Sequence, residues 1–314
     1  MQLKAYHKSI ASMTSYLDIT IVAAKQEDDT VARLMEGAYA IADHWIGIIS
    51  AWQEGTELYQ VNQQAGIAPV RVCKALFDLL KRSIRISEWT GGLFDVTFAS
   101  IDKVWYFDRP MTTLPTTEAI MHSIRNIDYR FIDLNEVNQS VFIRNKGTKI
   151  ELGAIGKGFI ANKMKEYLIS KGVHSGIVNA GGDLTAWGKN EQSETWKIAV
   201  ADPEKKERFI AWMPLTSGGI ATSGSYERYA LIDGKRYAHI IHPQTGYPVS
   251  GLKSVTIVSP DVELCDAIAT SVFLLGKEEG LAFVNQHPEL KCFIVDDEGA
   301  YHYSDNLKSV HYTN

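Results

Sequence analysis

The sequence has few cysteines, no cluster of basic residues and no hydrophobic run long enough to cross a membrane. Cys73, Cys265 and Cys292 are odd in number and too widely spaced for a metal-binding motif, so we expect buried free thiols. The net charge of −5, without a basic run, argues against nucleic acid as the main partner. Residues 1–13 lack the apolar core of a signal peptide. The compartment stays open: cytoplasmic as the sequence stands, or periplasmic or lipid-anchored if an export signal has been removed.

What the chain does have is enough apolar sequence for a large core. It is 314 residues long, 45% hydrophobic and 22% charged, which is typical of a globular protein with one large domain or two smaller ones. No internal repeat, low-complexity segment or clean linker divides it.

The most informative stretch is 151–158, which reads ELGAIGKG. A strand-like run at 148–152 precedes it, and a helical pattern follows to about Lys171. The three glycines permit positive φ and a close approach to the main chain. A glycine-rich turn at a helix N-terminus presents free N–H groups and the positive end of the helix dipole, which suits a diphosphate. A tight turn with a helix packed over it explains the same glycines. The stretch is not a Walker loop, because Lys157 is followed by Gly158 rather than by Ser or Thr.

Two glycines also separate two short strands further along the chain. The strand-like run 176–179 leads into AGGD at 180–183, and another strand-like run, 184–187, follows directly. A dinucleotide-binding fingerprint requires a helix at that point. The pattern therefore predicts a hairpin, with bare backbone in its turn, and not a Rossmann fold.

A helix near the C-terminus carries a pair of oxygen ligands. Ser259 is its expected N-cap, Pro260 its first residue and Gly276 its end. Asp266 and Thr270 are four residues apart and so lie on one face. A carboxylate on an otherwise apolar helix is costly to bury unless it is paired. With a diphosphate and the carbonyl of Ala154, the two side chains suit Mg²⁺; a carboxylate that caps a neighbouring loop is the alternative.

An indole and two imidazoles complete the candidate residues. Trp52, in a polar loop at 49–56, can stack on a planar ligand, or it is a half-buried loop aromatic. His239 can carry a proton at neutral pH, or it is a structural histidine within a strand. His242 is equally ambiguous.

The remaining pattern predicts further helices and strands. We expect a first strand over 18–23, a helix from Asp28–Thr30 to Ile49, a helix opened by Pro69 and extending to Ile84, a short helix over 116–127, and a meander of three strands over 129–134, 140–144 and 148–152.

Together these motifs resemble the FAD:protein FMN transferase family, also called the ApbE or Ftp family. The resemblance covers nearly the whole chain and depends on signatures in family order: TGGLFD at 90–95, ELGAIGKG at 151–158, VNAGGD at 178–183, ATSGSY at 221–226 with HIIHPQTG at 239–246, and DAIAT at 266–270. It implies an α+β fold related to the T-fold, with antiparallel sheets and packed helices. It also implies a single catalytic domain over 1–314, with two lobes around an FAD cleft.

The resemblance further implies a reaction and a site. FAD is cleaved at its pyrophosphate in a step that needs Mg²⁺ or another divalent cation, and FMN moves to a threonine or serine hydroxyl of an acceptor flavoprotein, releasing AMP. An FAD diphosphatase and a non-catalytic FAD-binding module are the alternatives. By position, the resemblance implies a metal site at Ala154, Asp266 and Thr270, FAD contacts at Trp52, Leu93, Phe94, Asp95, Glu151, Lys157 and His239, and catalytic roles for Asp266 and His239, the latter in proton transfer from the acceptor hydroxyl.

The sequence departs from the family pattern in three places. His242 stands where members commonly have Asp, and Glu151 stands where many have Asp. Residues 13–15 read Met-Thr-Ser, whereas many members have Met-Gly-Thr there.

Overall fold

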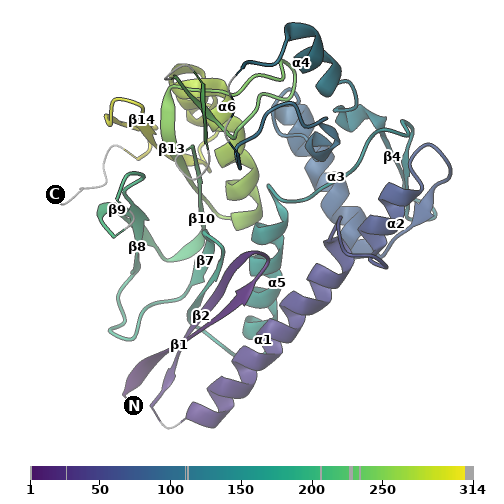
Figure 1. Ribbon diagram of the computed structural model, residues 1–314. Helices are drawn as coiled ribbons and strands as arrows, with labels where there is room; N and C mark the ends of the chain where they lie inside the picture. The colour runs from purple at the N-terminus through teal and green to yellow at the C-terminus, as the bar shows by residue number, and fades with distance from the viewer. Residues whose placement is uncertain are drawn as a thin grey trace.

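An eight-stranded antiparallel sheet organises the structure (Figure 1). The computed structural model describes residues 2–307 except 26, 110, 112, 206, 226–228 and 233–234. In spatial order the strands are β1 (Leu3–Ser12), β2 (Ser15–Ala24), β6 (Gly176–Ala180), β7 (Asp183–Trp187), β10 (Ser217–Gly224), β13 (Leu252–Ser259), β14 (Lys291–Asp296) and β15 (Tyr301–Tyr303). The predicted hairpin at 176–187 is confirmed as β6–β7, and both of its turn glycines, Gly181 and Gly182, have positive φ.

Three long helices cover one face of this sheet and form the main core with it. They are α1 (Asp28–Ile49), α5 (Gly156–Ser170) and α6 (Val262–Asn285). Helix α5 packs between α1 and α6 and also contacts β6 and β7, whereas α6 contacts β10 and β13. A ribbon of β8 (Trp196–Ala201) and β9 (Phe209–Leu215) closes the other face with a second apolar cluster. Among the residues that the structure describes, no helix is long and apolar enough to cross a membrane.

A second group of elements lies on the side of α5 and α6 that faces away from the large sheet (Figure 1). It comprises α2 (Glu57–Gln63), α3 (Lys74–Trp89), α4 (Thr117–Ser123), the single turns 98–100 and 129–131, the small sheet of β3 (Val70–Arg71), β5 (Ser140–Ile143) and β4 (Ile132–Asn135), and the hairpin of β11 (Tyr229–Ile232) and β12 (Lys235–Ala238). The predicted α+β class with antiparallel sheets is confirmed. The division into two lobes around a cleft stays a prediction.

Several predicted boundaries are wrong. The helix expected to open at Pro69 begins only at Lys74, because Val70–Arg71 pairs with β5 as a short strand. The run 148–152 is not a strand. Asn62 exchanges hydrogen bonds of 2.8 Å with both backbone groups of Ile150, and the Glu151 N–H donates to the Val96 carbonyl at 2.8 Å. These distant partners occupy the backbone groups that a neighbouring strand would need.

The C-terminal helix also differs from its prediction at both ends. Its N-cap is Asp261, whose carboxylate accepts from the Glu263 N–H at 3.0 Å, while Ser259 instead accepts from the Asp261 N–H. Gly276 breaks the helix as expected, with a φ of 79°, but helical residues resume after it and continue to Asn285.

The glycines of the ELGAIGKG stretch do not adopt the positive φ that the sequence permits. None of Gly153, Gly156 and Gly158 has positive φ. Gly158 instead lets α5 approach α6, since a Cβ there would lie 2.7 Å from both the Glu263 Cα and the Val262 carbonyl oxygen. The packed-turn explanation therefore holds for Gly158. The predicted helix is confirmed, with Lys171 as its C-cap.

We expect Gly158→Ala to destabilise the protein by about 1–3 kcal/mol, because the added methyl group forces two backbones apart. Gly47→Ala is the matched control, since Gly47 is an exposed glycine in helix α1 and a Cβ added there would meet no atom within 4 Å. That control should instead stabilise the protein by about 0.5–1 kcal/mol. Urea unfolding of both variants measures the difference, and equal effects would contradict the close helix contact.

A second stability prediction concerns the turn between β1 and β2. Met13 and Thr14 have φ values of 51° and 59°, so a β-branched residue sits in the left-handed region. We therefore expect Thr14→Gly to raise the free energy of unfolding by about 0.5–1 kcal/mol, through relief of that strain. Denaturant unfolding measures this change. A lower free energy of unfolding for the variant would show that the threonine side chain stabilises the fold by more than its backbone strain destabilises it.

Candidate active site

The N-terminus of α5 and the turn before it form one wall of the candidate site. Its N-cap residue, Ile155, provides no side-chain hydrogen bond to the first turn. The Glu151 carboxylate lies over Gly153, where a Cβ would be 2.7 Å from its Oε1. Burial raises the pKa of Glu151, and the Gly153 N–H and the Lys157 ammonium oppose that rise. The helix end thus presents the uncapped N-terminus that an anion requires.

Lys157, the second residue of α5, stands between two carboxylates from other elements. Its Nζ lies 2.5 Å from Asp183 Oδ2 on β7 and 3.8 Å from Asp266 Oδ1 on α6. Asp266 is 6% exposed, and its Oδ2 has no hydrogen-bond partner in the described part of the chain. Burial raises the pKa of Asp266 well above its ordinary value; the negative charge of Asp183 adds to this, and Lys157 opposes it. A buried oxygen without a partner is costly, so it marks where a cation fits.

The other proposed metal ligands lie beside this carboxylate. Thr270 is one helical turn after Asp266, and its hydroxyl lies 3.1 Å from the Ser223 hydroxyl on β10. Ala154 is half-buried in the turn that precedes Lys157. No group of three or more His, Cys, Asp or Glu side chains suited to a metal occurs within the described residues. A cation here would therefore depend on hydroxyl, carbonyl and substrate oxygens as well as on Asp266.

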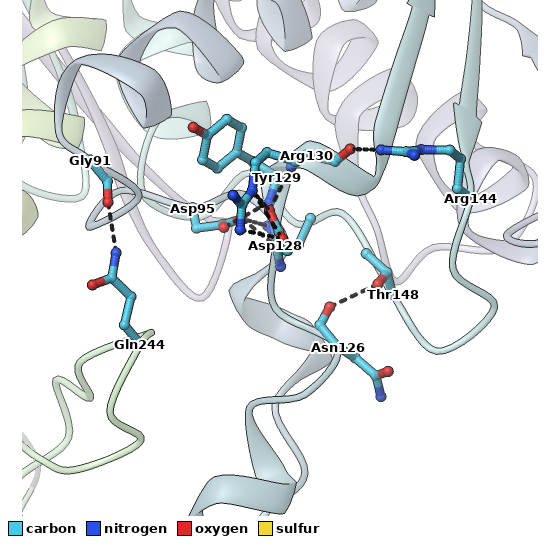
Figure 2. Close-up of polar contacts among 10 residues, drawn as sticks. Gly91, Asp95, Asn126, Asp128, Tyr129, Arg130, Arg144, Thr148 and Gln244 are labelled. Carbon is cyan, nitrogen blue, oxygen red and sulfur yellow. Dashed lines mark hydrogen bonds and ion pairs between the residues drawn. The ribbon is translucent and has the colours of Figure 1, made fainter.

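The TGGLFD loop is rigidly held by its own aspartate (Figure 2). Asp95 accepts hydrogen bonds from the Thr97 N–H at 2.7 Å, the Thr97 hydroxyl at 2.6 Å and the Tyr129 N–H at 2.9 Å. Burial raises its pKa, and these hydrogen bonds oppose the rise. Phe94 is buried and donates its N–H to the Thr90 hydroxyl, whereas Leu93 is half-buried. The Asp95 side chain thus shapes this loop, whatever it does toward a ligand.

The histidine-bearing loop is attached to the TGGLFD loop. The Gln244 side-chain amide donates to the Gly91 carbonyl at 2.7 Å (Figure 2). His242 Nδ1 accepts from the Gln244 N–H at 3.2 Å, and burial lowers the pKa of His242. His242 therefore has a turn-stabilising role. His239 is half-buried and follows directly after β12, in a bend and not within the predicted strand.

Trp52 lies in the loop between α1 and α2. A hydrogen bond of 2.6 Å from the Thr56 hydroxyl to the Ser50 carbonyl closes this loop. The indole is 67% exposed, so the half-buried alternative is wrong. An exposed indole is free to cover a planar ligand.

Asp183 is the site residue that the sequence reasoning did not single out. It is buried at the start of β7, on the strand face that also carries Thr185, and Lys165 of α5 donates to that threonine. An acid directly after two glycines, at the start of a strand-like run, was the available signal. Its partner, Lys157, comes from a separate motif, so only the fold joins the two.

Comparison with known proteins identifies the family of this chain. A profile of the ApbE family matches residues 13–294. The chain belongs to the ApbE family. A protein of Treponema pallidum named FAD:protein FMN transferase is 29% identical over 87% of this chain and 80% of its own. A protein of that name from Vibrio cholerae is 30% identical over 83% of this chain and 79% of its own.

Solved ApbE structures share the fold. The ApbE protein of Thermotoga maritima is 28% identical and superposes with a TM-score of 0.87, covering 99% of this chain and 100% of its own. The flavin transferase ApbE of Vibrio cholerae, at 23% identity, has a TM-score of 0.85 over 98% of this chain and 100% of its own. Tyr226, the last residue of the ATSGSY motif, lies outside the described residues.

Proposed function

We propose that this ApbE-family enzyme transfers FMN from FAD to a threonine or serine hydroxyl of an acceptor flavoprotein, in a reaction that needs a divalent cation. The names of the curated relatives support FMN transfer from FAD. The observation that carries the proposal is the buried Asp266 oxygen without a partner among the described residues, beside Lys157 and one turn from Thr270.

The phosphates of FAD would lie against the start of α5. The uncapped N-terminus and the Lys157 ammonium provide positive potential from one short segment. Glu151 folds over the turn, where it would limit how the ligand enters. The exposed Trp52 would cover the isoalloxazine ring, and Leu93, Phe94 and Asp95 would contribute the contacts of the rigid TGGLFD loop.

The cation ligands would be Asp266, the Thr270 hydroxyl and the Ala154 carbonyl. These are hard oxygen donors, and Mg²⁺ usually takes one or two carboxylates and completes its shell with water and phosphate oxygens. When bound there, such a cation supplies Lewis-acid stabilisation of the developing phosphate charge, worth several kcal/mol.

The chemical step is a displacement at phosphorus. The acceptor hydroxyl oxygen forms a bond to the FMN phosphorus, the bond from that phosphorus to the bridging oxygen breaks, and AMP leaves with the bridging oxygen. His239 would accept the hydroxyl proton, since an imidazole nitrogen is suited to act as a general base. The Gln244 contact to Gly91 would hold the histidine-bearing loop against the loop that binds the flavin.

The test combines the protein, FAD, Mg²⁺ and a flavoprotein domain that carries an acceptor threonine. We expect the acceptor to gain the mass of FMN less one water, and the acceptor with valine at that threonine to gain nothing. Free FMN and AMP in the absence of any acceptor would instead identify an FAD diphosphatase. Tight binding of FAD with no product in either mixture would identify a flavin-binding module.

A further inference from the structure

The ion pair between Lys157 and Asp183 joins two secondary-structure elements whose sequence motifs are separate, ELGAIGKG and VNAGGD. Lys157 belongs to α5 and Asp183 to the β6–β7 hairpin, and the Nζ–Oδ2 distance is 2.5 Å. The Asp183 side chain is 3% exposed and that of Lys157 is 32% exposed. A buried ion pair contributes little net stability, because desolvation offsets the attraction. Stability alone is therefore a weak reason to bury this carboxylate.

The two distances from the ammonium suggest what the pair does. Lys157 Nζ is in direct contact with Asp183 but remains 3.8 Å from Asp266 Oδ1. An ammonium that contacts a carboxylate directly lies about 2.7–2.9 Å from its oxygen. Of the two carboxylates that form ion pairs with this ammonium among the described residues, Asp266 is the one that remains when Asp183 is removed, and we expect the ammonium to move toward it. A lysine bound there would neutralise the carboxylate on which a divalent cation depends.

We propose that Asp183 is a positioning residue, which holds the Lys157 ammonium away from Asp266 and so keeps the Asp266 carboxylate available for the cation. The inference rests on the proposed function, because it takes Asp266 as a cation ligand. It assigns Asp183 no contact with the cation. Two other roles are open to the same carboxylate: direct coordination of the cation, and a general negative charge near it.

Removal of Lys157 distinguishes these roles. If Asp183 acts through Lys157, the Asp183→Asn defect in cation binding should disappear once the lysine is also removed. If Asp183 binds the cation or attracts it by charge alone, the defect should persist in full without the lysine. A double-mutant cycle separates the two cases, since groups that act through each other are not additive.

The experiment measures Mn²⁺ binding, without FAD, by titration calorimetry or by the electron paramagnetic resonance signal of free Mn²⁺. The proteins are the wild type, Asp183→Asn, Lys157→Met and the double variant. We expect Asp183→Asn to bind Mn²⁺ about tenfold or more weakly, and Lys157→Met to bind it at least as tightly as the wild type. The double variant should match Lys157→Met within about threefold.

The matched control is Asp18→Asn. Asp18 is a half-buried carboxylate in β2 of the same sheet, where its Oδ2 accepts from the Asn179 amide at 3.3 Å. Its Mn²⁺ affinity should equal that of the wild type. Circular dichroism and thermal unfolding check that each variant is folded. If Asp183→Asn does not fold, the test compares the double variant with Lys157→Met, because the double variant loses one charge of each sign. A Mn²⁺ affinity of the double variant tenfold weaker than that of Lys157→Met would overturn the inference.

The outcomes distinguish a failure of the positioning role from a failure of the proposed function. Equal losses from Asp183→Asn with and without Lys157, or no loss at all, would overturn the positioning role and leave the cation site intact. A wild-type protein that does not bind Mn²⁺ would overturn the cation site in the proposed function, and the inference with it.

Discussion

Asp266→Asn is expected to lower the rate of FMN transfer at least about 10³-fold. The substitution keeps the shape of the side chain but removes the charge on which cation binding depends, and several kcal/mol of transition-state stabilisation should be lost with the cation. Initial rates of acceptor modification at saturating FAD and Mg²⁺ measure the loss. Turnover within tenfold of the wild type would remove Asp266 from the proposed cation site.

The same variant should fold at least as stably as the wild type. Asp266 Oδ2 has no hydrogen-bond partner among the described residues, and Asp183 places a second negative charge beside it, so its replacement gives up no stabilising contact of that oxygen. Thermal unfolding of the metal-free proteins checks this. An inactive variant that is also strongly destabilised would show that Asp266 supports the fold.

Glu263→Gln is the matched control, because Glu263 is a buried acid in the same helix that does have a partner. Its two oxygens accept from Arg82 at 2.6 and 3.0 Å. Breaking this bidentate pair should cost on the order of 1–3 kcal/mol of stability and leave turnover of the folded protein unchanged. We therefore expect the Asp266 substitution to affect activity and the Glu263 substitution to affect stability.

His239→Asn is expected to lower the rate at saturating FAD by about 10²–10⁴-fold without abolishing it, the usual range for loss of one acid–base group. The remaining rate reflects the phosphate and cation interactions, which the substitution leaves in place. Single-turnover rates with the acceptor, together with FAD titrations, separate this loss from weaker binding. A variant whose whole loss disappears at high FAD concentration would assign His239 to binding and not to proton transfer.

His242→Asn provides the comparison for that variant. His242 is in the same loop, and its Nδ1 accepts from the Gln244 N–H. Asparagine retains an acceptor for that hydrogen bond, so we expect transfer within a few-fold of the wild type. A loss as large as that of His239→Asn would mean that the loop conformation, and not one imidazole, limits the reaction.

Local sequence patterns were sufficient to predict those features that residues close together in the sequence determine. The hairpin at 176–187 was predictable because two glycines interrupt two strand-like runs. Asp266 and Thr270 were predictable as a pair because helix periodicity alone places them on one face. The TGGLFD and HIIHPQTG segments were recognisable as motifs, although nothing in either one indicated that Gln244 would reach Gly91.

Sequence reasoning failed where a distant residue decides the outcome. The run 148–152 has the composition of a strand, but its backbone groups bind Asn62 and Val96. The sequence left positive φ and a packed helix open as explanations of Gly158, and only the contact with α6 decides for the second. Asp183 went unnoticed because its significance depends on Lys157, which only the packing of α5 against β7 brings near it.

The close approach at Gly158 has a consequence for how this enzyme tolerates sequence change. In the proposed function, α5 binds the phosphates and α6 supplies the carboxylate for the cation, and at Gly158 the main chains of the two helices come close together. A side chain at Gly158 would push the two helices apart and so move the proposed phosphate and cation ligands relative to each other.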